Sequence, residues 1–454
     1  MDLLIRNGTL VPVEADDPGR AFAGDLWVRD GRIAAMGPSP TVARAMREAG
    51  APPMRVLEAR GCAVLPGFVQ THVHLCQVLF RGMADDLPLL TWLKERIWPL
   101  EAAHDPQSLR ASADLGLAEL LKGGTTTLLD MGTVHHHDAV FEALYDSGMR
   151  AFSGKTLMDA GLDVPDGLRE TTDEALAESD RLADRWHNAD DGRLGYAYAP
   201  RFILSCTEAL FRGALTRARA RGCRLHTHAA EHPGERAAVN AVYGCDDVEQ
   251  LEKWGFVGPD VVIAHGVQLT PAQRRAMARS KTRVTHCPSA NMKLGSGVAK
   301  VVKMQRAGIV MGLGADGAPC NNNLDGWVEM RHAALLAKRL DRTTDLPAPE
   351  VLKLATLDGA RCLGIDDQVG SLALGKKADI QVVSLGGVHQ EPGGSTVARL
   401  VYATQSRDVR HVLVGGRLVV RDGRLLSLDE DAVLDRARHE ARSLCRRAGL
   451  SIEG

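Results

Sequence analysis

Pro66-Gly67-Phe68-Val69-Gln70-Thr71-His72-Val73-His74 is the most informative segment of this chain. It ends an apolar run that begins at Cys62, and it carries two histidines separated by one residue. Alternate residues of a β-strand lie on the same face, so His72 and His74 are expected to project together from the end of a buried strand. Two imidazoles that converge in this way indicate half of a metal site, and the alternative is a pair of hydrogen-bonded structural histidines.

The composition favours a large protein of the cell interior. The 454 residues suffice for a large barrel and a smaller unit. The formal net charge is −2 without a long block of one sign, which argues against a nucleic-acid or anionic-membrane binder. The nine cysteines are scattered without a C-x-x-C pair, so neither a disulfide framework nor a zinc ribbon is indicated. We therefore expect a cytoplasmic protein with no signal peptide and no membrane-spanning helix.

Both ends of the chain show the pattern of short strands joined by tight turns. The predicted strands cover residues 3–6, 24–29, 30–36, 376–383 and 409–420, and Asp30-Gly31 and Asp422-Gly423 mark turns. Each end alone offers too few strands to bury a core. We therefore predict that residues 1–64 and 368–454 form one discontinuous β-sandwich domain.

The middle of the chain alternates helical patterns with short apolar runs. The predicted strands there include residues 125–129, 223–228, 261–264, 282–285 and 309–313. About eight strand–helix units fit, so the fold class is α/β, with a (β/α)8 barrel of the TIM type over residues 65–367. The last stretch, from about Leu428, is predicted to be an amphipathic packing helix.

Four of the predicted barrel strands end in unusual polar residues. These are His72 with His74, His226 with His228 followed by Glu231, then His265, and finally Asp316. The carboxyl ends of barrel strands are where the catalytic loops of such folds lie. Burying several polar groups there without a function is costly, so the pattern favours a shared site.

These residue types suit metal-assisted hydrolysis. Three imidazoles and one carboxylate make a site for one divalent metal, Zn²⁺ or alternatively Fe²⁺, with a position left for water, and His72, His74, His228 and Asp316 are candidates for these ligands. Such a metal lowers the pKa of bound water toward about 7. Glu231 can then shuttle a proton. For His226 we predict a core role or one behind the ligands, and for His135-His136-His137 a solvated loop.

The combination of motifs resembles the amidohydrolase superfamily, in its branch of mononuclear-metal deaminases of purines and triazines. The resemblance covers nearly the whole chain, and its motifs are Pro66-Gly67-Phe68, Gly124-Thr125-Thr126-Thr127, His228 with Glu231, Ala264-His265-Gly266, His286-Cys287-Pro288-Ser289-Ala290-Asn291, Gly314-Ala315-Asp316-Gly317 and the tail from Gly370 to Asp379. It implies the metal ligands His72, His74, His228 and Asp316. It also implies that Glu231, His265 and Asp316 are catalytic, because they move protons.

Two subgroups compete for the substrate. Residues 81–93 and 97–101, together with 291–297 and 321–325, look like deaminases of 5′-modified adenosines, whose substrates include 5′-deoxyadenosine, 5′-methylthioadenosine and S-adenosylhomocysteine. Residues 74–77 and 200–206 look like guanine deaminase, in which an Arg and a Gln bind the purine edge and a Phe stacks on it. The Asp316 loop departs from the guanine deaminase pattern, and Cys320 stands where many nucleoside deaminases carry a serine.

Four residues are predicted to bind the substrate. Gln77 and Arg201 can supply polar contacts, and Trp92 or Phe202 can stack on the purine. The alternatives are core packing for Trp92 and a structural ion pair for Arg201.

We expect a homo-oligomer, a dimer or tetramer, that deaminates a small aminopurine, most of all a 5′-modified adenosine. The alternatives are a guanine deaminase, an s-triazine hydrolase or deaminase, a binuclear cyclic-amide hydrolase with a carbamylated lysine such as Lys155, and a non-catalytic binding protein. Base-flipping zinc deaminases combine H-x-E with P-C-x-x-C, but here Cys287-Pro288 has the reversed order and no second cysteine follows at that spacing, so nucleic acid is not the expected substrate.

Overall fold

The computed structural model describes residues 2–52, 54–161, 163–340 and 342–452. The chain divides into two compact units, each built from segments that are distant in sequence. The first unit comprises residues 1–70, 118–127 and 325–428, and the second comprises residues 71–117, 128–324 and 429–454.

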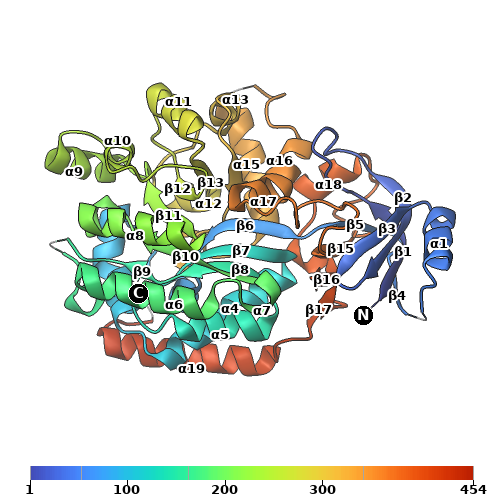
Figure 1. The fold of residues 1–454 in the computed structure, drawn as a ribbon, viewed down its shortest axis with the longest axis horizontal. Helices are drawn as coiled ribbons and strands as arrows, with labels where there is room; N and C mark the ends of the chain where they lie inside the picture. The colour runs from blue at the N-terminus through green and yellow to red at the C-terminus, as the bar shows by residue number, and fades with distance from the viewer. Residues whose placement is uncertain (1, 53, 162, 341, 453–454) are drawn as a thin grey trace. The chain divides into compact units, whose positions relative to one another are not determined.

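The first unit contains a nine-stranded sheet to which both ends of the chain contribute, as predicted (Figure 1). Its order is β18-β17-β16-β15-β5-β1-β2-β3, and β4 pairs with β1. The strands are β1 (Leu3–Leu10), β2 (Phe22–Arg29), β3 (Arg32–Gly37), β4 (Arg55–Glu58), β5 (Cys62–Pro66), β15 (Ile380–Ser384), β16 (Val409–Val414), β17 (Arg417–Arg421) and β18 (Arg424–Leu425). The antiparallel pair β5–β15, with Val64 opposite Val382, joins the two ends.

Local sequence explains this sheet. Asp30 and Gly31 both have positive φ, 49° and 75°, which is the backbone of the tight turn predicted between β2 and β3. Alternating side chains of β1, such as Leu3 and Ile5, are buried in a shared apolar cluster with Ile380 of β15.

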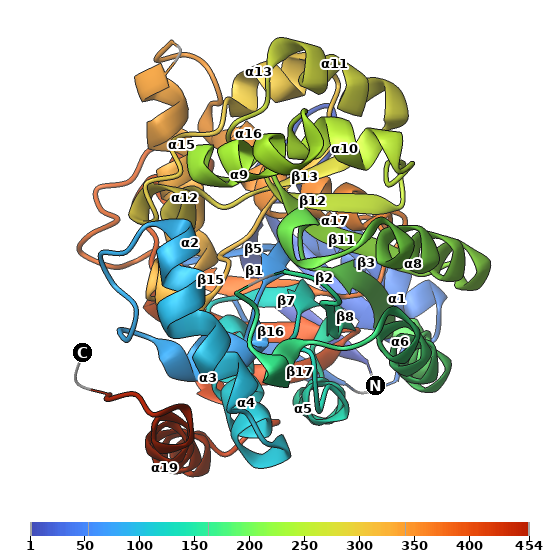
Figure 2. The ribbon, with the colours of Figure 1, turned by 90° about the vertical axis from the view of Figure 1, so that its left-hand side faces the viewer.

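The second sheet is a closed eight-stranded parallel barrel, which confirms the predicted α/β fold class (Figure 2). Its order is β11-β12-β13-β14-β6-β7-β8-β10, the pairing of β10 with β11 closes it, and the short β9 adds to β10. The strands are β6 (Phe68–Val73), β7 (Thr125–Met131), β8 (Arg150–Gly154), β9 (Thr156–Leu157), β10 (Leu194–Pro200), β11 (Arg224–Ala229), β12 (Val261–His265), β13 (Arg283–His286) and β14 (Met311–Leu313). Figure 2 shows α5, α6 and α8 outside the ring of strands.

Helices follow most of the barrel strands, and further helices lie among and after the strands of the first sheet. They are α1 (Ser39–Glu48), α2 (Leu89–Trp92), α3 (Trp98–Ala102), α4 (Pro106–Lys122), α5 (Asp138–Ser147), α6 (Thr172–Trp186), α7 (Ala189–Gly192), α8 (Glu208–Arg221), α9 (Pro233–Tyr243), α10 (Asp247–Lys253), α11 (Pro271–Ser280), α12 (Pro288–Lys293), α13 (Val301–Arg306), α14 (Ala318–Asn321), α15 (Gly326–Leu340), α16 (Ala348–Ala355), α17 (Leu357–Leu363), α18 (Thr396–Tyr402) and α19 (Glu430–Ala448). Short 3₁₀ turns η1 (Leu75–Phe80), η3 (Asp166–Leu168), η4 (Ile203–Ser205) and η5 (Ser406–Asp408) and the π-helical turn η2 (Leu93–Ile97) complete the list. None of the helices in the described ranges is long and apolar enough to cross a membrane.

The seam between β6 and β14 is held by small polar side chains. Thr285 Oγ1 donates to the Thr71 carbonyl oxygen at 3.0 Å, and Thr71 Oγ1 donates to the Leu313 carbonyl oxygen at 3.2 Å. A Cβ atom at Gly312 would lie 2.6 Å from the Thr71 side chain, so only glycine lets the strands approach this closely. The first and last barrel strands are thereby brought together directly before their site residues.

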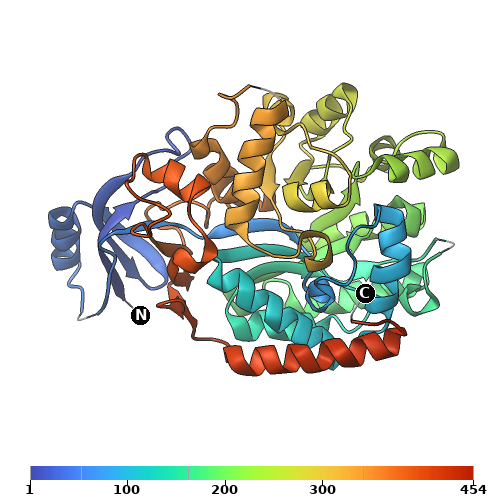
Figure 3. The ribbon, with the colours of Figure 1, turned by 180° about the vertical axis from the view of Figure 1, so that it is seen from behind.

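Helix α19, the long red helix in Figure 3, confirms the predicted C-terminal amphipathic helix. The Asp429 side chain accepts from the Ala432 N–H at its start, and Gly449 ends it with a φ of 67°. Within the second unit, Arg436 pairs with buried Asp114 at 3.2 Å and Arg447 Nε donates to the Ala103 carbonyl oxygen at 2.8 Å.

Candidate functional site

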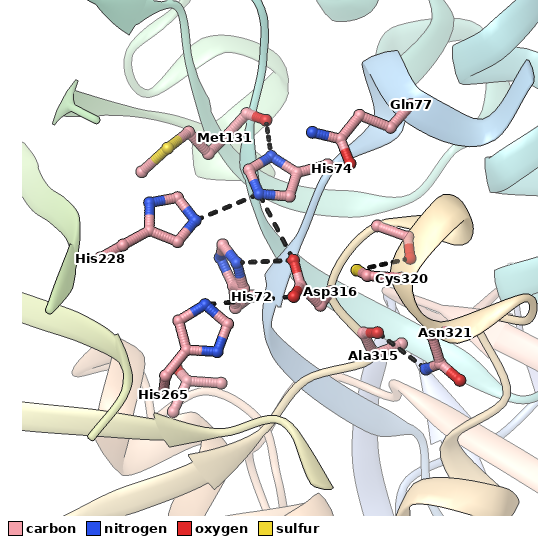
Figure 4. A network of polar contacts seen from close by, with 12 residues as sticks. His72, His74, Gln77, Met131, His228, His265, Ala315, Asp316, Cys320 and Asn321 are labelled. Atoms are coloured by element: carbon pink, nitrogen blue, oxygen red, sulfur yellow. Dashed lines mark hydrogen bonds and ion pairs between the residues drawn. The ribbon is translucent and has the colours of Figure 1, made fainter. Parts of the chain in front are cut away.

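Five predicted site residues meet at the carboxyl ends of four barrel strands (Figure 4). His72 and His74 come from the end of β6, His228 from β11, His265 from β12, and Asp316 follows β14. Asp316 is bridged to Val73 of β6, and its N–H donates to the His72 carbonyl oxygen at 3.2 Å. His265 and Asp316 have positive φ, 78° and 64°, a strained backbone that is concentrated at functional sites.

The ring nitrogens and the carboxylate converge on one point. Asp316 Oδ1 lies 3.1 Å from His72 Nε2 and 3.4 Å from His74 Nε2. Asp316 Oδ2 lies 4.0 Å from His265 Nε2, and the Nε2 atoms of His74 and His228 are 3.2 Å apart. The potential ligand atoms of His72, His228, His265 and Asp316 all lie within 4.8 Å of one another. The chain thus has a three-histidine, one-aspartate group that is able to bind a metal ion.

The proton positions in this group favour a cation. The outer Nδ1 atoms of His74 and His228 face the carbonyl oxygens of Met131 and Arg201 at 2.7 and 2.9 Å, and a carbonyl can only accept. The two Nε2 atoms therefore present lone pairs to each other, and that of His74 also faces the Asp316 carboxylate. Such a set of acceptors repels itself unless a positive ion lies among them, and these are ligands typical of a zinc site.

The four metal ligands predicted from the sequence and the tightest group of potential ligands in the structure differ in one residue. The sequence predicted His74 with His72, His228 and Asp316, whereas the tightest group contains His265 in place of His74. All five side chains are nevertheless in one cluster, and the role of each stays a prediction.

Burial sets the charges of the cluster. It lowers the pKa of His72 and His74 to about 4, and it also lowers the pKa values of His228 and His265. Burial alone would raise the pKa of Asp316, but the hydrogen bond with His72 and the surrounding imidazoles hold it well below its usual range. At neutral pH the imidazoles are therefore uncharged, and the aspartate is ionised.

Glu231 lies at the edge of this cluster, and its pKa is raised, whereas the pKa values of the histidines are lowered. Its Oε2 atom is 3.4 Å from His265 Nε2, and the other ring nitrogen of His265 is 2.9 Å from Asn291 Oδ1. Burial, followed by the charge of Asp316, raises the pKa of Glu231 well above its usual value. A carboxyl group that keeps its proton beside ionised Asp316 is suited to general-acid chemistry.

A cavity in the second unit adjoins the cluster. Its lining includes all four predicted substrate-binding residues, and consists of His74, Gln77, Leu89, Trp92, Leu93, Arg201, Phe202, His228, Glu231, Glu235, His265, Leu294 and Asp316. The structure therefore brings Gln77, Trp92, Arg201 and Phe202 to the same space as Glu231.

Glu101 is a residue whose role the sequence did not reveal. It accepts from Gln77 Nε2 at 2.8 Å and from both terminal nitrogens of Arg201 at 2.5 and 3.3 Å. The side chains of Glu101 and Arg201 are 0% and 4% exposed. Arg201 thus forms the ion pair that was considered as an alternative and also lines the cavity. A buried arginine needs a carboxylate partner, and Glu101 is the last residue of the segment 97–101 that resembles deaminases of 5′-modified adenosines. These two facts could have identified Glu101 as the partner of Arg201.

Other residues that the sequence analysis mentions lie outside the cavity lining. His135 and His136 are exposed, whereas His137 is buried with its Nε2 atom 2.9 Å from Ser153 Oγ. Lys155 is buried and pairs with Glu170 at 2.5 Å. Cys320 Sγ donates to the Gly317 carbonyl oxygen at 3.0 Å, next to Asp316.

Comparisons with known proteins show the family of the chain. The model of the Amidohydrolase family matches residues 63–419. The chain is 38% identical to a 5-methylthioadenosine/S-adenosylhomocysteine deaminase of Desulforudis audaxviator, over 98% of this chain and 99% of that one. It is 36% identical to a 5′-deoxyadenosine deaminase of Methanosarcina acetivorans, over the same shares of the two chains.

Solved structures extend the similarity to the fold. An adenosine deaminase from Xanthomonas campestris with bound zinc aligns with a TM-score of 0.90 and 32% identity, covering 98% of this chain and 99% of that one. The E. coli guanine deaminase aligns with a TM-score of 0.84 and 29% identity, covering 92% and 99%.

Proposed function

The chain belongs to the amidohydrolase family, and from this we propose that it is a hydrolytic deaminase, a hydrolase of carbon–nitrogen bonds in cyclic amidines, that releases ammonia from an aminopurine. We favour a 5′-modified adenosine as substrate, because relatives named for such substrates match nearly the whole chain. The observation that carries the proposal is the position of Glu231, whose Oε2 atom lies 3.4 Å from His265 Nε2 beside the three-histidine, one-aspartate group.

We propose that the group holds one divalent metal per chain, Zn²⁺ rather than Fe²⁺. His72, His74, His228 and Asp316 would be its ligands, and His265 lies within reach of the same point. When bound, the metal supplies the Lewis acidity that activates water for attack on the ring carbon that bears the amino group.

The protein side chains then manage the protons. Glu231 gives its proton to the ring nitrogen next to the attacked carbon, while Asp316, which lies beside His265, accepts the first proton of water as the carbon–oxygen bond forms. Asp316 then passes this proton to the leaving amino group as the carbon–nitrogen bond breaks, and the second proton of water goes to Glu231, which restores its carboxyl group. One aminopurine and one water thus become one oxopurine and one ammonia.

The cavity residues would bind the base. Trp92 or Phe202 supplies a stacking face, and Gln77 and Arg201 supply polar contacts that Glu101 holds in place.

Guanine is the second candidate substrate, because Gln77, Arg201 and Phe202 line one cavity together as the sequence resemblance to guanine deaminase implies. A binuclear cyclic-amide hydrolase is less favoured. The nitrogen of Lys155, which would need to be carbamylated, is engaged by Glu170.

A screen of ammonia release by the zinc-loaded protein tests these substrates. The compounds are guanine, adenosine, 5′-deoxyadenosine, 5′-methylthioadenosine, S-adenosylhomocysteine and melamine. We expect the 5′-modified adenosines to give the highest kcat/KM. Turnover of guanine alone would reject our first choice, and turnover of melamine alone would support a triazine deaminase.

Two further measurements complete the test. Metal analysis should find one zinc per chain, whereas two tightly bound metals would support the binuclear alternative. Light scattering during gel filtration tests our expectation of a homo-oligomer, a dimer or tetramer.

A further inference from the structure

His226 is a fully buried histidine behind the metal-binding group, and the chemistry above does not use it. It lies on β11, two residues before His228, and is absent from the cavity lining. Its Nε2 atom is 2.8 Å from His72 Nδ1, and its own Nδ1 atom is 2.9 Å from the Val262 carbonyl oxygen. It therefore contacts a predicted ligand from the side opposite to the cluster.

The two hydrogen bonds fix where the protons are. A carbonyl oxygen only accepts, so His226 Nδ1 must carry the proton that faces Val262. A neutral imidazole has one ring proton, and its Nε2 atom is then an acceptor. His72 Nδ1 must donate to that acceptor, which leaves His72 Nε2 without a proton on the side of Asp316, 3.1 Å away.

The outer ring nitrogen of His72 has a different kind of partner from the outer ring nitrogens of His74 and His228. The outer nitrogens of His74 and His228 face backbone carbonyls, which permit one tautomer only. The outer nitrogen of His72 faces another imidazole, which can donate or accept. The tautomer of His72 therefore depends on that of His226, and the Val262 carbonyl determines both.

We propose that His226 is a positioning residue that selects the metal-binding tautomer of His72. This inference rests on the metal site of the proposed function, and not on the identity of the substrate. Partners of this kind tune metal affinity although they do not touch the ion. In the other tautomer of His226, a proton on its Nε2 would force one onto His72 Nε2, where it would block the lone pair that binds metal.

Zinc affinity of three variants tests the proposal. The metal is removed from the full-length protein, and zinc binding is measured by competition with a chromophoric chelator. H226L removes the acceptor, and should weaken zinc binding by about tenfold to a hundredfold. H226Q offers an amide oxygen to His72 Nδ1, and should retain most of the affinity.

H104L is the matched control, because His104 is also a buried histidine with two hydrogen bonds, to Ser108 and to the Cys76 carbonyl oxygen. It should bind zinc as the wild type does. Wild-type affinity in H226L, or equal losses in H226L and H226Q, would overturn the proposal.

A second measurement covers the case in which H226L does not fold. Nitrogen-15 NMR of histidine-labelled, zinc-free wild type, assigned with H226Q, reports the tautomers directly. We expect protons on Nδ1 of both His72 and His226, and a proton on His72 Nε2 would refute the inference. If zinc affinity falls in H226L but the wild type deaminates none of the compounds, the deaminase proposal fails and the role of His226 stands.

Discussion

Burial shifts the pKa of Glu231 and the pKa values of the nearby imidazoles in opposite directions. Burial raises the pKa of the Glu231 carboxyl and lowers the pKa values of His72 and His74, because both effects disfavour the charged form. One desolvated pocket thus places a carboxyl group with a raised pKa beside imidazoles with lowered pKa values, as the proposed proton donor and metal ligands require.

This arrangement predicts the result of replacing Glu231 by glutamine. E231Q should lower kcat by about 10² to 10⁴, the usual contribution of a positioned proton donor, because an amide cannot give a proton to the ring nitrogen. Ammonia release measures the rate, and metal analysis should show wild-type zinc content. Turnover at the wild-type rate would reject the role of Glu231.

Glu101 predicts a second effect at a single residue. In E101Q the buried Arg201 loses its charged partner, which should cost about 3 kcal/mol of unfolding free energy and raise KM. Denaturant unfolding measures the first effect, and steady-state kinetics measures the second.

E208Q is the control for that variant, since Glu208 and Arg212 form an exposed pair with about half of each side chain accessible. Its unfolding free energy should change by less than about 1 kcal/mol. Equal losses in E101Q and E208Q would contradict the importance assigned to the buried pair.

At the level of elements, the sequence predicts the positions of strands better than the contacts between distant segments. Periodicity located β11 and β12 to within a residue or two, and the polar residues at their ends marked the site, because parallel strands must end on one side of a barrel. The division at residues 64 and 368 stays a prediction.

Contacts between distant segments were out of reach of the sequence. Glu101 of α3 meets Arg201, and His226 of β11 meets His72 of β6, only in the folded chain, and no local pattern encodes these contacts. Residues 89–97 form α2 and the π-helical turn η2, a division for which the sequence offered no prediction.

The junction of η1 with α4 makes stability depend on pH. His104 lies between them, and burial lowers its pKa to about 4. The unfolded chain takes up a proton there below about pH 6.5, whereas the folded protein does not, so stability falls as the pH drops from about 6.5 to 4.

Replacing His104 should weaken the dependence of stability on pH. Between pH 7 and pH 5, H104Q should lose about 2 kcal/mol less unfolding free energy than the wild type. Urea titrations at the two pH values measure the difference. H439Q, which replaces an exposed histidine of α19, should behave like the wild type, and an unchanged drop in H104Q would refute the prediction.

For the whole molecule, the metal should add stability because it binds only when segments distant in sequence are assembled. Free zinc at 100 times its Kd should add about 2.7 kcal/mol to the unfolding free energy. Thermal unfolding with and without a chelator checks this, and we expect the chelator to lower Tm. D316N, which lacks one proposed ligand, should be much less sensitive to the chelator, and a wild-type Tm that ignores it would speak against the site.

The seam between β6 and β14 bears on how the protein is made. His72 and Asp316 are 244 residues apart in the chain, yet they lie side by side where the first and last barrel strands meet. A growing polypeptide that has not yet reached Asp316 contains only part of the ligand group. We therefore expect the ion to be acquired only after Asp316 has been synthesised, when it can join the two ends of a long loop.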